Sequence, residues 1–245
     1  DINEAIDLGG LPDVAVNKMR LCKPAAYAIK ALTLLNMQKW DEAEEAAKQA
    51  LAINGAVNDY NNAYQGTAQG YLAGGTYPII NRGQKGTDED YFYDNSFEFY
   101  NCYTPETMAN FEDGHAYKEK MSCANMTYDY MMDASESILG EPGFNITCDL
   151  NSRWNDGGLR STQMYLAIAE CETHKGNFDT AMEYLDKVRI NRIDPAKYQP
   201  LKGTVSTEKD AIAHVKQVTL NEDIYSSFIF IDKKRWNQLD GWKQS

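Results

Sequence analysis

Two segments of the chain, residues 27–51 and residues 165–189, repeat one pattern of apolar and polar positions. In each, small and apolar side chains recur every three or four residues on both sides of a short polar break, a spacing that predicts two amphipathic helices joined by a turn. The matched positions are Tyr27 with Tyr165, Ala31 with Ala169, Trp40 with Phe178, Asp41 with Asp179 and Ala43 with Ala181.

Small residues at matched positions of two antiparallel helices, with an aromatic residue at the turn, are typical of tetratricopeptide (TPR) repeats. We therefore predict a mainly α fold of TPR-like helical hairpins, an α-α superhelix, in which the hairpins bury their apolar faces by stacking. The first hairpin should occupy residues 22–54 and the second residues 159–192. In the first, Asp41 is the expected N-cap of the second helix, and Ala25, Ala28, Ile29, Leu32 and Leu35 form the expected apolar stripe of the first.

The stretch between the hairpins, residues 55–158, has a different character. It is rich in Gly, Asn, Tyr and Thr, and seven of the thirteen residues from 91 to 103 are aromatic. A loop this long is uncommon without a function or strands of its own. We predict a long irregular aromatic-rich excursion with a short helix capped by Thr104, a helical stretch over about 116–139 and a short strand near 144–148. A C-terminal helical segment, 206–245, should begin with a helix capped by Ser206 or Thr207.

Composition narrows the class of protein. The 245 residues carry a net charge of −12, and this acidic balance argues against nucleic acid as a partner. No segment approaches the ~20 apolar residues of a membrane-spanning helix. The first ten residues, DINEAIDLGG, lack the basic start and apolar stretch of a signal peptide, which suggests a chain that begins inside a longer protein.

Chemistry-bearing motifs are scarce. The cysteines show no CxxC pair and the histidines no HExxH spacing, so we expect no metal, no cofactor and no enzymatic activity. Buried free thiols are the simplest expectation for the cysteines, with one or two loop disulfides as the alternative. The acidic run 88–90 could bind calcium, although a solvated acidic turn fits it better. The cysteines are Cys22, Cys102, Cys123, Cys148 and Cys171, and the histidines are His115, His174 and His214.

Three ordered groups of residues resemble a known family. They are Gly158-Leu159-Arg160 followed by the second hairpin, the signature Ile231-Asp232-Lys233-Lys234-Arg235-Trp236-Asn237, and Phe99-Tyr100 followed by Thr104-Pro105-Glu106. Together they resemble the SusD/RagB family over most of the chain, from about residue 20 to 240. The chain departs from the family pattern before the signature, where an E-R-x-x-E-L run is usual and only Glu222 fits.

The resemblance implies a function and a location. Family members are surface-exposed lipoproteins of the outer membrane of Gram-negative bacteria, where they capture oligosaccharides or other nutrients without catalysis. They pass the ligand to a SusC-like TonB-dependent transporter. Residues 1–245 would then be a single-domain fragment lacking the N-terminal part, with membrane attachment only through a lipid anchor that these residues do not contain.

If the ligand is a glycan, aromatic rings should stack on its apolar C–H faces and amides or guanidinium groups should bind its hydroxyls. Substituting Tyr91 and Tyr93 by Ala should then weaken binding and leave the fold intact. The structural alternative is that the rings form a small core within the excursion, that Trp154 packs at the entrance of the second hairpin, and that Arg235 pairs with Asp232. The candidate residues are Tyr71, Tyr77, Asn81, Arg82, Tyr91, Tyr93, Asn95 and Trp154.

A second class of function stays open. TPR hairpins also serve as protein–protein interaction modules that bind a peptide or a partner protein. Peptide-binding arrays usually run in tandem with a period near ~34 residues, whereas residues 52–164 separate the two hairpins here. A glycoside hydrolase would need two facing carboxyl groups ~5–10 Å apart, and no such pair stands out in the sequence.

Overall fold

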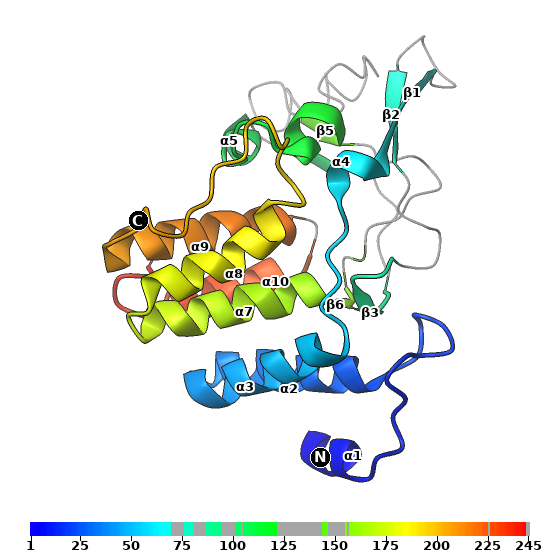
Figure 1. The fold of residues 1–245 in the computed structure, drawn as a ribbon, viewed down its shortest axis with the longest axis vertical. Coiled ribbons are helices and arrows are strands. Elements are labelled where there is room, and N and C mark those ends of the chain that lie inside the picture. The colour runs from blue at the N-terminus through cyan, green and yellow to red at the C-terminus, as the bar shows by residue number, and fades with distance from the viewer. Residues whose placement is uncertain are drawn as a thin grey trace.

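The computed structural model is mainly α-helical, which confirms the predicted fold class. It describes residues 1–69, 76–80, 87–94, 101–103, 105–121, 144–146, 155, 157–224 and 226–243; for 63–69, 76–80, 101–103, 105, 120–121 and 144–146 only the backbone is considered. Six helices, here called the helical frame, stack in successive layers (Figure 1). They are α2 (Lys23–Asn36), α3 (Trp40–Ile53), α7 (Ser161–His174), α8 (Phe178–Arg189), α9 (Glu208–Glu222) and α10 (Phe228–Trp236).

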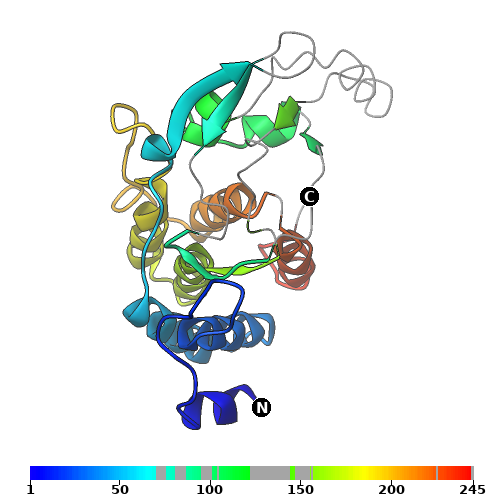
Figure 2. The ribbon, with the colours of Figure 1, turned by 90° about the vertical axis from the view of Figure 1, so that its right-hand side faces the viewer.

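The two hairpins, α2–α3 and α7–α8, lie directly against each other although the excursion separates them in sequence (Figures 1 and 2). Alanines at the buried positions of α2 and α3, including Ala28, Ala31, Ala43 and Ala47, are fully buried. Side chains this small let helix backbones approach closely, so α3 packs against both α2 and α7. The stacking of TPR-like hairpins is therefore achieved in space without a tandem sequence.

Helices α9 and α10 form a third layer, which packs against the second hairpin and closes the core there. Thr207 caps α9, as predicted, by accepting a hydrogen bond from the backbone N–H of Asp210 at 3.2 Å. Trp236 at the end of α10 is fully buried and donates its indole N–H to Glu170 at 3.0 Å. The predicted pair of Arg235 with Asp232 is present at 2.8 Å, and Arg235 also binds both carboxylate oxygens of Glu170.

Two local predictions for the first hairpin are wrong. Helix α3 begins at Trp40 with Lys39 as its N-cap, so Asp41 lies in the first turn and pairs across the hairpins with Lys175 at 2.8 Å. Ile29 is 37% exposed rather than part of the buried stripe. The buried face of α2 is set by close approach to α3, which selects its alanines and leaves the larger Ile29 outside.

The excursion contains short strands in two-stranded antiparallel pairs: β1 with β2, β3 with β6, and β4 with β5. Helix α5 begins at Pro105, as predicted, while its expected cap Thr104 lies outside the described residues, and β5 lies within the predicted strand. Of the helical stretch predicted over 116–139, the described part forms the π-helix η1, and 122–139 lie outside the described residues. The remaining elements are α1 (Ile2–Asp7), α4 (Tyr60–Ala63), β1 (Tyr64–Gln69), β2 (Thr76–Ile80), β3 (Asp90–Phe92), β4 (Asn101–Tyr103), α5 (Pro105–Ala109), η1 (Tyr117–Met121), β5 (Phe144–Ile146) and β6 (Leu159–Arg160).

Across the described parts of the chain, none of the helices combines the length and the apolar character that crossing a membrane requires.

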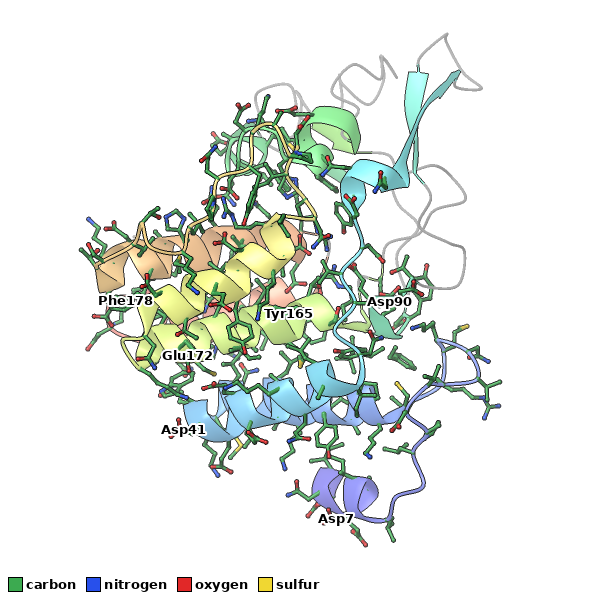
Figure 3. All side chains as sticks on the ribbon, viewed as in Figure 1. Asp7, Asp41, Asp90, Tyr165, Glu172 and Phe178 are labelled. Atoms are coloured by element: carbon green, nitrogen blue, oxygen red, sulfur yellow. The ribbon has the colours of Figure 1, made fainter. Side chains whose placement is uncertain are left out.

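Charged side chains join the two hairpins at the end of the stack where Asp41 and Glu172 lie (Figure 3). The Lys175 ammonium binds Glu44, Asp41 and Glu172, and Glu44 also binds Lys48. Burial raises the pKa of the Glu44 carboxyl, but the hydrogen bonds from Lys175 and Lys48 outweigh burial and hold its pKa at about 2. The Glu172 carboxyl has a raised pKa, because it is buried and lies beside Glu44.

Because the folded-state pKa of Glu44 is depressed, its contribution to stability is present above its ordinary pKa of 4.5. It is lost as the pH falls from there through about 2. We expect Glu44→Gln to lower the stability at pH 7 and to show a smaller further loss than wild type between pH 4.5 and 2. Urea unfolding across this range measures both effects. The exposed neighbour Glu45→Gln is the matched control, and identical acid profiles for wild type and Glu44→Gln would contradict the assignment.

Candidate functional site

The excursion leaves and rejoins the helical frame at a single place, where three stretches of the chain meet. These stretches are residues 54–60, 87–94, and 155 with 157–161, here called the excursion base. Strands β3 and β6 pair within it, beside the start of α7 (Figure 1). Two backbone N–H groups hold the base together at Glu89. The Asn58 N–H donates to the Glu89 carboxylate at 3.0 Å, and the Ser161 N–H donates to the Glu89 carbonyl at 2.9 Å.

Asn155 connects the returning chain to β3. Its amide nitrogen donates to the Asp90 carboxylate at 2.7 Å and to the Phe92 carbonyl at 2.8 Å, and its amide oxygen accepts from the Asp94 N–H at 2.9 Å. Gly158 is required beside it, because a Cβ there would lie 1.9 Å from the Asn155 amide oxygen and 2.1 Å from the Phe92 carbonyl. The geometry of the base thus depends on both residues.

Two of the candidate aromatic residues belong to the base, and neither presents its ring to solvent. Tyr91 is 1% exposed and Tyr93 is 7% exposed. The Tyr91 hydroxyl donates to the Asn54 carbonyl at 2.5 Å, and burial raises the pKa of this hydroxyl. The Tyr93 N–H donates to the Lys18 carbonyl at 2.6 Å. These two rings therefore pack as the structural alternative for the excursion expected.

Buried ion pairs tie the base to α9. The Arg192 guanidinium binds both oxygens of Glu222, at 2.7 and 2.9 Å, and binds Glu89 at 3.1 Å. Its central carbon, Cζ, lies 3.7 Å from the centre of the Tyr60 ring. Burial lowers the pKa of Arg192, but Glu222 and its other partners hold that pKa well above the ordinary value. This cation stays charged and satisfies two carboxylates that are otherwise shielded from water.

A second buried ion pair also joins the base to the C-terminal end of α9. Arg160, at the end of β6, binds the Asp223 carboxylate at 2.5 Å and the Glu222 carbonyl at 2.9 Å. Both partners of this pair are buried, Arg160 at 4% exposure and Asp223 at 3%. The sequence pointed to this region only through Glu222, the one residue that fits the family pattern before the signature. Nothing in a single sequence indicated that Arg192 and Arg160 would bind it.

Two of the three side chains of the acidic run 88–90 are buried in protein contacts, and Asp88 is exposed. Glu89 binds Arg192, and Asp90 accepts hydrogen bonds from the Thr87 N–H at 2.5 Å and from Asn155. Burial raises the pKa of Asp90, and the adjacent Glu89 charge adds to that effect. Among the residues that the structure describes, no cluster of three or more His, Cys, Asp or Glu side chains could hold a metal ion.

The remaining candidates are not brought together by the described structure. Tyr77 has only its backbone described, in β2, where it pairs with Ala68. The other five lie outside the described residues: Tyr71, Asn81, Arg82, Asn95 and Trp154. The base residues Asn155, Arg160 and Arg192 were missed at the level of the sequence, because their roles depend on contacts between distant segments.

The described cysteine and histidine side chains named here are buried or packed against other rings. The thiols of Cys22 and Cys171 are free and buried, as expected, and burial raises the pKa of both. The side chains of the other three cysteines lie outside the described residues. Burial lowers the pKa of His115 to about 3, and His174 stacks between Trp40 and Trp242 with ring centres 3.9 and 4.8 Å apart.

No family model and no curated protein matches the chain. Solved structures do. A SusD superfamily protein from Bacteroides thetaiotaomicron aligns with a TM-score of 0.66 at 16% identity, over 100% of this chain and 56% of that one. A SusD-like carbohydrate binding protein from Bacteroides vulgatus gives 0.64 at 16%, over 96% and 49%. Surface glycan-binding protein A from B. thetaiotaomicron in complex with laminarihexaose gives 0.52 at 14%, over 96% and 59%.

These alignments show that the chain has a SusD-like fold, as the ordered motifs indicated. They extend over nearly all of this chain, including both hairpins and the excursion between them. The chain spans only about half to three fifths of the length of the proteins it matches. At this level of identity the agreement is one of fold, and the function needs its own argument.

We expect Arg192→Met to destabilise the protein by about 3–5 kcal/mol, because it leaves Glu89 and Glu222 buried without a cation. Met keeps an apolar stem but is shorter than Arg, so lost packing over Tyr60 adds to the loss of charge and hydrogen bonding. Urea unfolding at pH 7 measures the loss, with the exposed Arg20→Met as the matched control. Equal unfolding midpoints for both variants would show that the pairs do not hold the base.

We also expect Tyr91→Ala to destabilise the fold by about 3–5 kcal/mol, contrary to the expectation that this substitution leaves it intact, because it empties a buried site. Tyr91→Phe keeps the ring and leaves the Asn54 carbonyl without its donor, at a cost of about 1–3 kcal/mol. Thermal unfolding of the two variants separates packing from hydrogen bonding. A Tyr91→Ala variant as stable as wild type would place the ring outside the core.

Proposed function

We propose that the chain is part of a non-catalytic SusD/RagB-type protein that captures an oligosaccharide at the cell surface. The observation that carries this proposal is the SusD-like fold over nearly the whole chain, shared with proteins described as carbohydrate-binding or laminarin-binding. One such structure holds laminarihexaose. Which glycan this chain binds is a separate question, since the aligned proteins share only 12–18% of its residues.

The structure supports a division of labour between frame and excursion. The helical frame and the excursion base are fixed by close alanine packing and by buried ion pairs, so the excursion starts from a rigid platform. Binding residues are commonly carried on loops that a rigid scaffold positions. We assign ligand contacts to the part of the excursion beyond its base, with Tyr71, Tyr77, Asn81, Arg82, Asn95 and Trp154 as the candidate residues.

The proposal also includes a partner protein, a transporter, and a location, the outer membrane. As a member of the SusD/RagB class, the whole protein would be a lipoprotein of the outer membrane that passes its ligand to a SusC-like TonB-dependent transporter. The stacked helices would supply the docking surface for that transporter. Co-purification of the full-length protein with an outer-membrane transporter from its native cells tests this part, and its recovery in the cytoplasm would contradict it.

A glycan array that includes laminarihexaose, probed with this chain and with its full-length parent, tests the capture function directly. For the best glycan found, we expect the double substitution Tyr71→Ala and Tyr77→Ala to weaken binding by about fivefold or more, since each stacked ring contributes ~0.5–1.5 kcal/mol. Calorimetry gives the affinities, and circular dichroism verifies the fold.

The control for this experiment is Phe230→Ala, which removes a 71% exposed ring on α10, outside the excursion. It should leave the glycan affinity unchanged. An affinity equally insensitive to both changes would remove Tyr71 and Tyr77 from the site. Failure of both chain and parent to bind any sugar would overturn the capture function itself.

A further inference from the structure

A cavity of about 230 Å³ lies between α2, α7, the C-terminal end of α9, and α10. Its walls are largely apolar, and Ile29 and Ile231 at its lining are 37% and 41% exposed, so the cavity opens to solvent. Pockets for drug-sized ligands are usually ~300–1,000 Å³. This cavity is smaller and suits a single aliphatic chain rather than a sugar oligomer. The apolar wall residues are Ile29, Leu32, Leu35, Leu166, Phe228 and Ile231.

The inner lining of the cavity is charged. Three carboxylates line it, from Glu170 on α7, Asp223 at the end of α9 and Asp232 on α10. Arg235, also in the lining, binds Glu170 through two hydrogen bonds, and Arg160 binds Asp223. Two guanidinium groups thus pair with three carboxyl groups, so the acidic groups outnumber the cations by one.

Asp232 is the carboxylate with the weakest pairing. One of its oxygens binds Arg235 at 2.8 Å, but Arg235 is shared with Glu170 and with the Asn36 side chain. The second oxygen of Asp232 has no hydrogen-bond partner among the residues that the structure describes. Burial raises the pKa of Asp232 to about 7, the Arg235 charge opposes this, and the Asp223 and Glu170 charges add to it.

We propose that this cavity is a binding site for a primary alkylammonium group. The apolar walls would pack against the alkyl stem between Ile29 and Ile231, and the ammonium would donate to the free oxygen of Asp232. A cation there gives a partner to the Asp232 oxygen that Arg235 does not bind. The site is separate from the glycan contacts proposed for the excursion, and it stands whether or not the chain binds a sugar.

Calorimetry with hexylammonium and with 1-hexanol at pH 8 tests the proposal, because the two probes share a stem and differ in charge. We expect hexylammonium to bind at least about tenfold more tightly than hexanol, and Asp232→Asn to remove that difference. The matched control is Asp240→Asn, whose side chain is 98% exposed and pairs only with the exposed Lys243 among the described residues; it should keep the preference. Circular dichroism verifies that each variant folds.

The pH dependence provides an independent measurement. Near pH 7 a fraction of Asp232 is protonated, and a bound ammonium favours the ionised form, so binding should release protons and strengthen between pH 6 and pH 8. The charged groups that face Asp232 are Arg235 on α10, Glu170 on α7 and Asp223 after α9, and Arg160 lies behind Asp223. Asp232→Asn should abolish the dependence.

Nα-acetyl-lysine methylamide separates the two sources of such a group. If it competes with hexylammonium, the natural occupant is a lysine side chain of a protein; if only the free amine binds, the occupant is a small molecule. Absence of binding by both amines, equal binding of hexanol, or an unchanged preference in Asp232→Asn would each overturn the proposal.

Discussion

Several contacts join the excursion to the helical frame, among them the Arg189–Glu112 pair, and the buried guanidinium of Arg192 is the one that links three distant segments. It lies just beyond α8, yet it binds Glu222 at the end of α9 and Glu89 in the middle of the excursion. A buried ion pair contributes little net stability compared with apolar packing, but breaking one is costly, because a charge is left without water or partner. This asymmetry fixes the relative position of three distant segments and makes alternative placements of the excursion unfavourable.

Close packing of small side chains is the second constraint. Alanines on α2 and α3 bring the first hairpin against α7, and the contact is closed at one end by Lys175 and its carboxylate partners. The long insertion between the hairpins is tolerated because loop-closure entropy grows slowly with length. The base of the excursion, including Tyr91, packs into the core of the stack, so only the outer part of the excursion can vary without disturbing that packing.

Two kinds of recognition are proposed for different parts of the molecule. The glycan contacts are assigned to the rings and amides of the excursion, and the ammonium site to a small cavity of the frame with apolar walls and an incompletely paired carboxylate. The first kind of surface suits an extended neutral ligand and the second a short cationic one. Since the two lie on different elements, each can be occupied without the other.

The sequence by itself determined the helical hairpins, the cap at Thr207, the start of α5 at Pro105, and the resemblance that the fold comparison supports, because helical periodicity and capping depend on residues close in the chain. It also indicated that Arg235 and Trp236 are structural. Only the tertiary structure decided that Tyr91 and Tyr93 are buried, that Asn155 and Arg192 hold the excursion base, and that Ile29 borders a cavity. Those outcomes depend on which distant segments come together, and a pattern along one chain carries no record of which distant partner a buried charge or ring will meet.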